Sequence, residues 1–362
     1  MKILIVSDLK YVGGTEIASS ITANSLRNLG YEVAILGAGG PVSEQLKADG
    51  FKHFSYETHT KNPLKIFVTI FMLARILVSE KIDIVHCQMA RPVPWVWIAK
   101  QLVCSKAKIF WTCRGIHEKT YKKIVPLFNR MRVRALGNCK QEQQKLIKYG
   151  FKEDFTGYAY NAYRLSPSYT NILEPDLEPF IVGTLSALRP ERRIDLFLEV
   201  AARILEKNIN KINVHFLICG DGPEKIKLEE YAERLGISDY VTFLGSYLDV
   251  VPFFKKIHIC VSSITMEGDS GAGVSNSIVE SMVMKVPVCA FDALAIKEIV
   301  LDKKTGRLIE AGNIEAMTDA ILELWERADL RKQYSEAAFE LIKQNCDPKS
   351  YGEKLVTYYR DM

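Results

Sequence analysis

Residues 257–291 hold the pattern most indicative of a ligand site. They read as a buried strand, a loop with three glycines, a helix that begins near Ser275 and Asn276, and a second buried strand. A helix that begins at such a loop presents free backbone N–H groups and the positive end of its dipole, which suits a phosphate. Glu280 lies about one turn into the helix, where a carboxylate can accept hydrogen bonds from a ribose diol. The alternative is that Glu280 is a solvated helix acid.

Three arginines mark a second candidate phosphate-binding segment, GTLSALRPERRID at residues 183–195. Arg189, Arg192 and Arg193 stand where a predicted strand gives way to a helix. A guanidinium matches a phosphate with two parallel N–H donors. We expect one or two of the three to face a ligand and the rest to be solvated. The turn CGDGPE at 219–224 ends a further strand, and a structural turn is the better interpretation of its Asp221.

The segment DLKYVGGTE at residues 8–16 follows the first predicted strand. Its Gly13 and Gly14 let the backbone approach a ligand, and Thr15 can cap the next helix. The alternative is an ordinary strand-to-helix turn. The G-x-G-x-x-G spacing of dinucleotide sites is absent, which argues against a nicotinamide-dependent enzyme.

Histidines also follow predicted strands in this half of the chain. Arg114 and His117 come after one strand in FWTCRGIHE, and His86 ends another in IVHCQ. A histidine at a strand end can hydrogen-bond a hydroxyl or a carbonyl group, although a lone histidine is more often structural. Of the two histidines, His117 is the better candidate for a ligand contact.

Short apolar runs alternate with amphipathic stretches, and the pattern restarts after a segment marked by Pro167, Pro175 and Pro179. Such alternation is typical of a parallel sheet covered by helices on both faces. The predicted strands are Lys2–Ser7, Val33–Gly37, Lys52–Tyr56, Asp83–Gln88, Lys108–Cys113, Val133–Gly137, Phe180–Leu185, Asn213–Cys219, Tyr240–Leu244, Ile257–Ser263, Val286–Phe291 and Gly306–Ile309. The predicted helices are Thr15–Leu29, Pro63–Glu80, Val93–Val103, Lys140–Tyr149, Ile194–Lys207, Pro223–Leu235, Ile314–Arg327 and Pro348–Arg360.

The fold class that follows is α/β, with two doubly wound, Rossmann-like domains facing each other across a cleft. We place the first domain at residues 1–165, a linker at 166–180 and the second domain at 181–345. Residues 346–362 hold the last helix, which we expect to pack outside the second sheet. Ligands of such sheets bind beyond the carboxyl ends of the strands, so the cleft is the expected site.

The two halves of the chain differ in charge. Residues 1–170 contain 25 Lys and Arg against 12 Asp and Glu, and the remaining residues contain 23 against 31. The basic half should attract an anionic membrane surface, a lipid phosphate or a polyanionic glycan, and no recognised module points to nucleic acid. The eight cysteines lack metal-ligand spacing and read as small buried side chains in a reducing cytoplasm. We identify no signal peptide and no run long enough to span a bilayer.

Two stretches of the basic half could lie at a membrane surface. The run His117–Arg134 mixes basic and apolar residues as interfacial helices do, and Pro63–Glu80 adds apolar surface. A core helix with one solvated face is the alternative, and it is favoured for Pro63–Glu80.

Taken together, these segments resemble the retaining GT-B glycosyltransferases known as group 1 or family 4. GGTE at 13–16 is similar to the family's N-terminal phosphate loop, and NAYRL at 161–165 to the segment before its interdomain linker. GTLSALRPERRIDLFLEVA, GDGP, VTFLG and GVSNSIVESMVMKVPV follow in the family's order. The resemblance covers essentially the whole chain.

The resemblance implies a nucleotide-sugar donor held mainly by the second domain. Arg192 takes the place of the family's phosphate-binding Lys, and Glu280 that of its ribose-binding Glu. His117 matches the histidine near the donor sugar, Gly14 the glycine beside the diphosphate, and Tyr247 lies where the backbone holds the base. The expected catalytic residues are His117, Arg192 and Glu280. The expected donor-binding residues are Gly13, Gly14, Arg189, Tyr247, Gly271, Ala272, Gly273, Val274, Ser275 and Glu280.

Two positions depart from the family's pattern. The phosphate-binding Arg five residues before the Lys is Ala187 here, and the first Glu of the E-x7-E motif falls on Ala272. Glu267 replaces that Glu if GDSGA is an insertion, and Arg189 is the neighbour that could compensate for the missing Arg.

The expected function is transfer of a sugar from a UDP- or GDP-sugar to a hydroxyl group of a lipid-linked or cell-envelope glycan, with retention of configuration. No metal and no cofactor besides this co-substrate are expected, because Arg192, the Gly271–Ser275 amides and the helix dipole would stabilise the leaving diphosphate. The expected location is the cytoplasm, peripherally on the inner face of the plasma membrane. One alternative is a catalytically degenerate GT-B protein that binds a glycan or pairs with an active transferase. Another is a sugar-nucleotide epimerase, which would need further acid–base residues.

Overall fold

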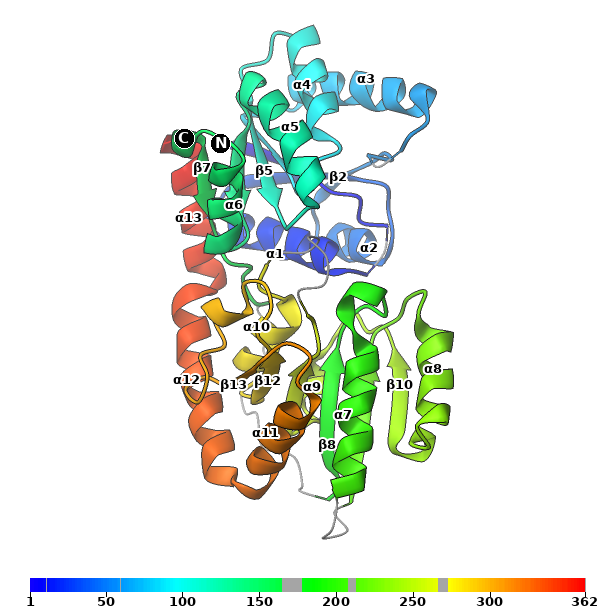
Figure 1. The fold of residues 1–362 in the computed structure, drawn as a ribbon. Coiled ribbons are helices and arrows are strands. Elements are labelled where there is room, and N and C mark those ends of the chain that lie inside the picture. The colour runs from blue at the N-terminus through cyan, green and yellow to red at the C-terminus, as the bar shows by residue number, and fades with distance from the viewer. Residues whose placement is uncertain (11, 59, 165–177, 208–212, 266–272, 362) are drawn as a thin grey trace. The chain divides into compact units, whose positions relative to one another are not determined.

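Apolar strands alternate with amphipathic helices along the chain, and they build two parallel sheets in the computed structural model (Figure 1). The structure describes residues 1–10, 12–58, 60–164, 178–207, 213–265 and 273–361. They form two units. The first contains Met1–Ala162, Gly273 and the residues from Cys346 onward, and the second contains Tyr163–Gly268 and Val274–Asn345. Most of the predicted linker at 166–180 lies outside the described residues.

The first unit contains a seven-stranded parallel sheet in the order β3-β2-β1-β4-β5-β6-β7. Both faces are covered, so neighbouring residues of its strands are buried in separate cores, Leu4 in one and Ile5 in the other. Its strands are β1 (Lys2–Val6), β2 (Glu32–Gly37), β3 (Lys52–Ser55), β4 (Ile84–Cys87), β5 (Lys108–Cys113), β6 (Arg134–Gly137) and β7 (Thr156–Tyr158). Its α-helices are α1 (Gly14–Asn28), α2 (Pro41–Ala48), α3 (Pro63–Ser79), α4 (Val93–Leu102), α5 (Glu118–Arg130), α6 (Lys140–Lys148) and α13 (Pro348–Asp361), and η1 (Glu153–Phe155) is a short 3-10 turn.

The second unit contains a six-stranded parallel sheet in the order β10-β9-β8-β11-β12-β13. Its strands are β8 (Phe180–Leu185), β9 (Val214–Cys219), β10 (Val241–Gly245), β11 (Ile259–Ser262), β12 (Val288–Phe291) and β13 (Arg307–Ile309). Its α-helices are α7 (Ile194–Lys207), α8 (Lys225–Arg234), α9 (Val251–Phe254), α10 (Asn276–Val283), α11 (Ile314–Glu326) and α12 (Ala328–Asn345). The 3-10 turns are η3 (Pro190–Arg192), η4 (Ser238–Tyr240) and η5 (Ile296–Glu298).

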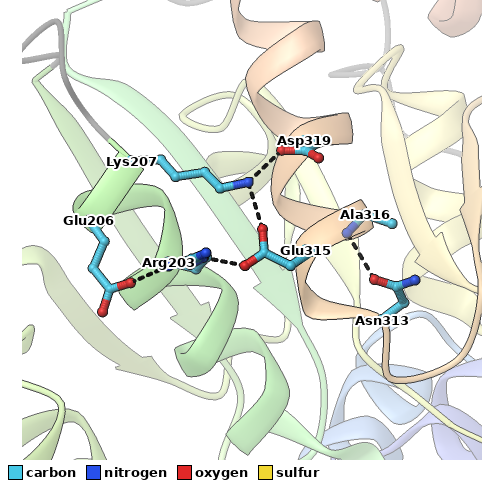
Figure 2. Close-up of polar contacts among 7 residues, drawn as sticks. All are labelled: Arg203, Glu206, Lys207, Asn313, Glu315, Ala316 and Asp319. Atoms are coloured by element: carbon cyan, nitrogen blue, oxygen red, sulfur yellow. Dashed lines mark hydrogen bonds and ion pairs between the residues drawn. The ribbon is translucent and has the colours of Figure 1, made fainter.

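Helices α7 and α11 lie side by side on the second sheet and are joined at the surface by charged residues (Figure 2). Lys207 Nζ contacts Glu315 at 2.6 Å and Asp319 at 2.7 Å, and Arg203 also pairs with Glu315. Asn313 caps α11 by accepting a hydrogen bond from the Ala316 N–H at 3.0 Å. Exposed ion pairs contribute little individually to stability, so the packing of the apolar faces of α7 and α11 holds these two helices on the sheet.

The strands and helices predicted by residue range are all present, with ends shifted by at most two residues, and the run His117–Arg134 contains the shorter helix α5. Helices α2, α9 and α12 and strand β7 were not predicted. Three of these elements are eight residues or shorter, so periodicity gives little signal.

The packing predicted for the last helix is wrong. Tyr351, Leu355 and Tyr359 of α13 are buried in the core of the first unit, together with Ile3 and Ile5 of β1. Their spacing shows that the helix has one apolar face. That spacing carries no information about which of two sheets the face covers, and α13 lies beside α1 (Figure 1).

The preference for a core interpretation of Pro63–Glu80 is also wrong in part. Helix α3 buries Leu73 and Leu77 but leaves other large apolar side chains exposed. Those exposed side chains are Leu64, Phe67, Val68, Phe71 and Val78.

Seven cysteines are buried as expected, whereas Cys104 is exposed. Within the described ranges, no helix is both long and apolar enough to cross a membrane.

Candidate functional site

The topology of the second sheet creates a site between β8 and β11. From β8 the strands progress in one direction through β9 and β10, and from β11 in the other through β12 and β13. The loops that leave β8 and β11 therefore diverge at the carboxyl ends of these strands, where open α/β sheets bind ligands. The segments with the three arginines and with Ser275 both begin here.

The three arginines of the first loop have different surroundings. Arg193 is paired with Asp195 at 2.9 Å, and Arg189 is exposed beside a surface pocket of about 520 Å³. The guanidinium of Arg192 is partly buried, and burial lowers its pKa. Within the described part of the chain, the Arg192 guanidinium has no hydrogen-bond or ion-pair partner. Arg192 is therefore the arginine of this loop best prepared for an anion.

Two glycines of the CGDG turn hold the arginine loop in place. A Cβ on Gly220 would lie 1.8 Å from the Ser186 carbonyl oxygen, and one on Gly222 would lie 2.4 Å from that of Leu188. The Leu188 N–H donates to the Asp221 carbonyl at 3.0 Å. Only glycine permits such close approach, so this turn is structural, as predicted.

The second loop leads into α10, which begins at Asn276 with Ser275 at the N-cap position. The Ser275 hydroxyl lies 2.8 Å from that of Ser277 and does not cap a backbone N–H. The helix begins as predicted, but the Ser275 side chain leaves the backbone donors of the first turn to other partners.

Glu280 lies on α10 and is 4% exposed, so it is not a solvated helix acid. Its Oε1 lies 3.2 Å from Arg164 Nε, but neither of these two atoms makes a hydrogen bond of acceptable geometry. Arg164 also donates to the Leu248 carbonyl, next to Tyr247. Burial raises the pKa of Glu280, and Arg164 opposes that shift. The structure thus brings the Tyr247 loop and Glu280 together through Arg164.

Arg164 is a site residue that the sequence did not predict, although NAYRL was singled out. An arginine just before a predicted linker gives no local sign of its partner, and Glu280 lies 116 positions further along the chain. Tyr247 itself is 42% exposed in the loop between β10 and α9.

The remaining predicted residues of the first unit follow the ends of β1 and β5. Gly13 is the N-cap of α1 and Gly14 its first residue, so Thr15 lies inside the helix and is not the cap. His117 is the N-cap of α5, and its Nδ1 accepts a hydrogen bond from the Lys119 N–H at 3.2 Å. This bond fixes the tautomer that leaves the proton of the neutral ring on Nε2.

His86 is a core residue. Its Nδ1 lies 2.6 Å from the Tyr359 hydroxyl and its Nε2 2.7 Å from the Thr112 hydroxyl. Burial lowers the pKa of His86 to about 3. Both ring nitrogens are engaged, which agrees with the structural interpretation.

Some predicted positions lie at or beyond the limits of the described residues. Gly271, Ala272 and Glu267 fall outside them. Val274 is buried, and Ala187 is exposed in the arginine loop. Gly273 lies against Asn138, where a Cβ would be 2.2 Å from the side-chain nitrogen.

Two doubly wound sheets, with a partly buried arginine and a buried carboxylate at the switch point of the second, define a two-domain α/β protein with a candidate nucleotide site. Two family models match this chain. One, described as "Glycosyl transferase 4-like", covers residues 2–136, and the other, "Glycosyl transferases group 1", covers residues 179–327. The chain belongs to these GT-B glycosyltransferases.

Individual relatives agree with this assignment. Poly(ribitol-phosphate) alpha-N-acetylglucosaminyltransferase of Staphylococcus aureus is 31% identical over 180 residues, which cover 49% of this chain and 35% of that protein. N-acetyl-alpha-D-glucosaminyl L-malate synthase of Bacillus anthracis is 22% identical over 97% of this chain and 94% of that protein. HepE of Anabaena, solved in complex with UDP-glucose, superposes with a TM-score of 0.83 over the whole of both chains at 18% identity. At that identity the structural match shows the fold alone.

Proposed function

We propose that this chain transfers a sugar from a UDP- or GDP-sugar to a hydroxyl group of a cell-envelope glycan, with retention of configuration. The observation that carries the proposal is the Glu280 carboxylate. It is 4% exposed at the switch point of the second sheet, and its Oε1 accepts no hydrogen bond from the described residues. Arg164 Nε lies 3.2 Å from this oxygen but is not aligned for a hydrogen bond, and the hydroxyl groups of a ribose would supply aligned donors.

The charge of the donor's diphosphate requires nearby cations and N–H donors. Arg192 supplies a guanidinium with no carboxylate partner among the described residues, and α10, the element after β11, begins without a side-chain cap from Ser275. As the bond to the sugar breaks, negative charge grows on the diphosphate, and these groups stabilise it without a divalent metal. In this proposal His117 orients the sugar, the Tyr247 backbone holds the base, and Gly13 and Gly14 offer backbone to the diphosphate.

The proposed acceptor is a lipid-linked or cell-envelope glycan bound by the basic first unit. Among the relatives are proteins named for poly(ribitol-phosphate) and for the lipopolysaccharide core. The proposed location is the cytoplasmic face of the plasma membrane.

Helix α3 supports peripheral attachment to that membrane. Leu64, Phe67, Phe71 and Val78 are between 57% and 78% exposed, and their spacing places them on one stripe that also contains Arg75. An apolar stripe of this kind beside basic residues favours an anionic lipid surface.

The alternative of a catalytically degenerate protein rests on Ala187, which stands where the resemblance places the family's phosphate-binding arginine. Arg193 does not replace it freely, because Arg193 is paired with Asp195 at 2.9 Å. Turnover of a panel of UDP- and GDP-sugars distinguishes the two functions. Release of UDP or GDP at a rate that EDTA does not lower supports the enzyme, whereas nucleotide-sugar binding without turnover supports the alternative.

Replacement of Glu280 by Gln tests the nucleotide site. We expect the affinity for UDP or GDP, measured by isothermal titration calorimetry, to fall about tenfold or more, because charge-assisted hydrogen bonds are worth about 1.5–3 kcal/mol. Glu229→Gln on the exposed side of α8 is the matched control and should leave the affinity unchanged. An unchanged dissociation constant for Glu280→Gln, with circular dichroism showing an intact fold, would refute the ribose role.

A further inference from the structure

The carboxyl edge of the first sheet holds a second polar cluster that the donor site does not use. Its members follow four neighbouring strands: Gln88 after β4, Arg114 after β5, Asn138 after β6 and Asn161 after β7. Gln88, Asn138 and Asn161 are 1%, 4% and 7% exposed. These four polar residues lie at the end of a parallel sheet beside the β1–β4 switch point, which is where open α/β sheets commonly bind ligands.

The side chains that hydrogen-bond the Arg114 guanidinium are both neutral. Its Nη1 donates to Asn161 Oδ1 at 2.7 Å, and its Nη2 donates to Gln88 Oε1 at 2.6 Å. Among the described residues no carboxylate lies within ion-pair distance of this guanidinium. Burial lowers the pKa of Arg114, and the more distant Glu16 carboxylate opposes that shift. Amide oxygens orient a guanidinium without neutralising it, so Arg114 retains its full positive charge.

The unsatisfied atoms around Arg114 are also donors. Arg114 Nε is buried without a partner, and so is Gln88 Nε2. The orientation of the Gln88 amide follows from chemistry, since its oxygen must face the Arg114 donor and its nitrogen must therefore face away. A cation without an ion-pair partner and two buried N–H groups without acceptors favour a ligand that brings negative charge and several acceptor oxygens.

We propose that Arg114 and Gln88 bind an anionic group, a carboxylate or a phosphate, on the glycosyl acceptor. The proposal deepens the proposed function and rests on it, because it assumes that the acceptor binds to the first unit. Neither Arg114 nor Gln88 is among the residues proposed above to bind the sugar donor. The specificity that follows is for acidic acceptors over neutral ones of the same size.

Small anions test the site directly in the full chain. Inorganic phosphate, sodium D-glucuronate and neutral D-glucose are titrated into the protein with saturating UDP present, and binding is measured by calorimetry. We expect phosphate or glucuronate, or both, to bind in the millimolar range, and glucose to bind at least about tenfold more weakly. Binding of phosphate alone identifies a phosphorylated acceptor, and binding of glucuronate alone identifies a carboxylated one. If neither anion binds more tightly than glucose, the proposal is overturned.

Substitutions assign the binding to this cluster. Arg114→Gln should weaken the anion about tenfold or more through loss of a charge-assisted pair, and Gln88→Met, which removes only the neutral donor, should weaken it less. Arg130→Gln removes an exposed charge from the end of α5 in the same unit and should leave the affinity within about twofold. Equal anion binding by wild type and Arg114→Gln would overturn the proposal. If Arg114→Gln does not fold, Gln88→Met decides instead, and anion binding equal to that of wild type would overturn the proposal.

The affinity for UDP, measured in the same samples, separates the two proposals. Arg114→Gln should bind UDP as wild type does, because the Arg114 guanidinium hydrogen-bonds Asn161 and Gln88, neither of which is a proposed donor-binding residue. If the wild-type protein does not bind UDP, the proposed donor site is contradicted. If it binds UDP but does not bind phosphate or glucuronate more tightly than glucose, only the proposed acceptor site is contradicted.

Discussion

Residues of one type have different roles in this protein because their partners differ. Arg193 is neutralised by Asp195, Arg114 is held by two amide oxygens, and Arg192 has no partner among the described residues. A guanidinium is permanently charged, so its surroundings alone decide whether that charge is already used or is available to an anion. Surroundings also set the role of Glu280, a buried carboxylate whose only ion-pair partner in the described residues is Arg164.

His86 should make the protein less stable in acid. The native state keeps His86 neutral because burial lowers its pKa to about 3, whereas the unfolded chain protonates it near its ordinary value of 6.5. The unfolded state thus binds more protons between these values, and stability falls as the pH falls through this window. From pH 7.5 to pH 5 the contribution of this one group should fall by about 2 kcal/mol.

His86→Gln removes this titration and measures it. Urea unfolding at pH 7.5 and pH 5 should show a smaller acid-induced loss of stability in the variant than in the wild-type protein, by about 2 kcal/mol. The comparison uses the difference between the two pH values, so it is independent of any overall destabilisation by the substitution. Parallel losses in the two proteins would contradict the assignment.

At the scale of elements, the sequence period predicted where the helices lie in the chain better than it predicted which of their side chains are buried. Helix α7 buries the apolar face that its sequence shows, including Phe197 and Ile204. Helix α3 is more apolar along its sequence, yet it leaves Phe67 and Phe71 71% and 62% exposed. Mean apolar character does not determine burial, because burial also needs a second surface against which the helix can pack.

The exposed stripe of α3 should control membrane binding. The double variant Phe67→Ser and Phe71→Ser should lower the partition coefficient on vesicles of 30% phosphatidylglycerol in phosphatidylcholine about tenfold or more, since each Phe buried in the interface contributes roughly 1 kcal/mol or more. Sedimentation with the vesicles measures this effect. Ile226→Ser, which alters a side chain that is 69% exposed on α8 of the second unit, is the control and should bind as wild type does. Unchanged sedimentation of the double variant would exclude α3 as the attachment surface.

At the scale of the whole molecule, the chain returns from the second unit to complete the first. Leu355 and Tyr359 of α13 are 1% exposed and belong to the same core as β1, more than 340 residues earlier in the sequence. The first unit therefore depends on the end of the chain for part of its core.

Matched core truncations should separate the two units. Leu355→Ala should lower the stability of the first unit by about 2–5 kcal/mol, and Leu324→Ala in α11 should do the same to the second. Hydrogen exchange read by mass spectrometry is expected to show reduced protection in β1 and β4 for Leu355→Ala and in β8 and β9 for Leu324→Ala. Loss of protection confined to the second sheet in Leu355→Ala would contradict the assignment of α13 to the first unit.

The local pattern of this sequence determined which segments are strands, where α7 and α10 begin, and that Arg192 and Glu280 lie on segments that follow strands of a doubly wound fold. These features depend on side-chain period and backbone preference within a few residues of each other. Only the tertiary structure decided that α13 covers the first sheet, that Arg164 lies against Glu280, and that Gln88 and Asn161 hold Arg114. Each of these contacts joins segments that are distant in the sequence, and whether they meet depends on the order of strands in the sheets and on which apolar faces remain to be covered.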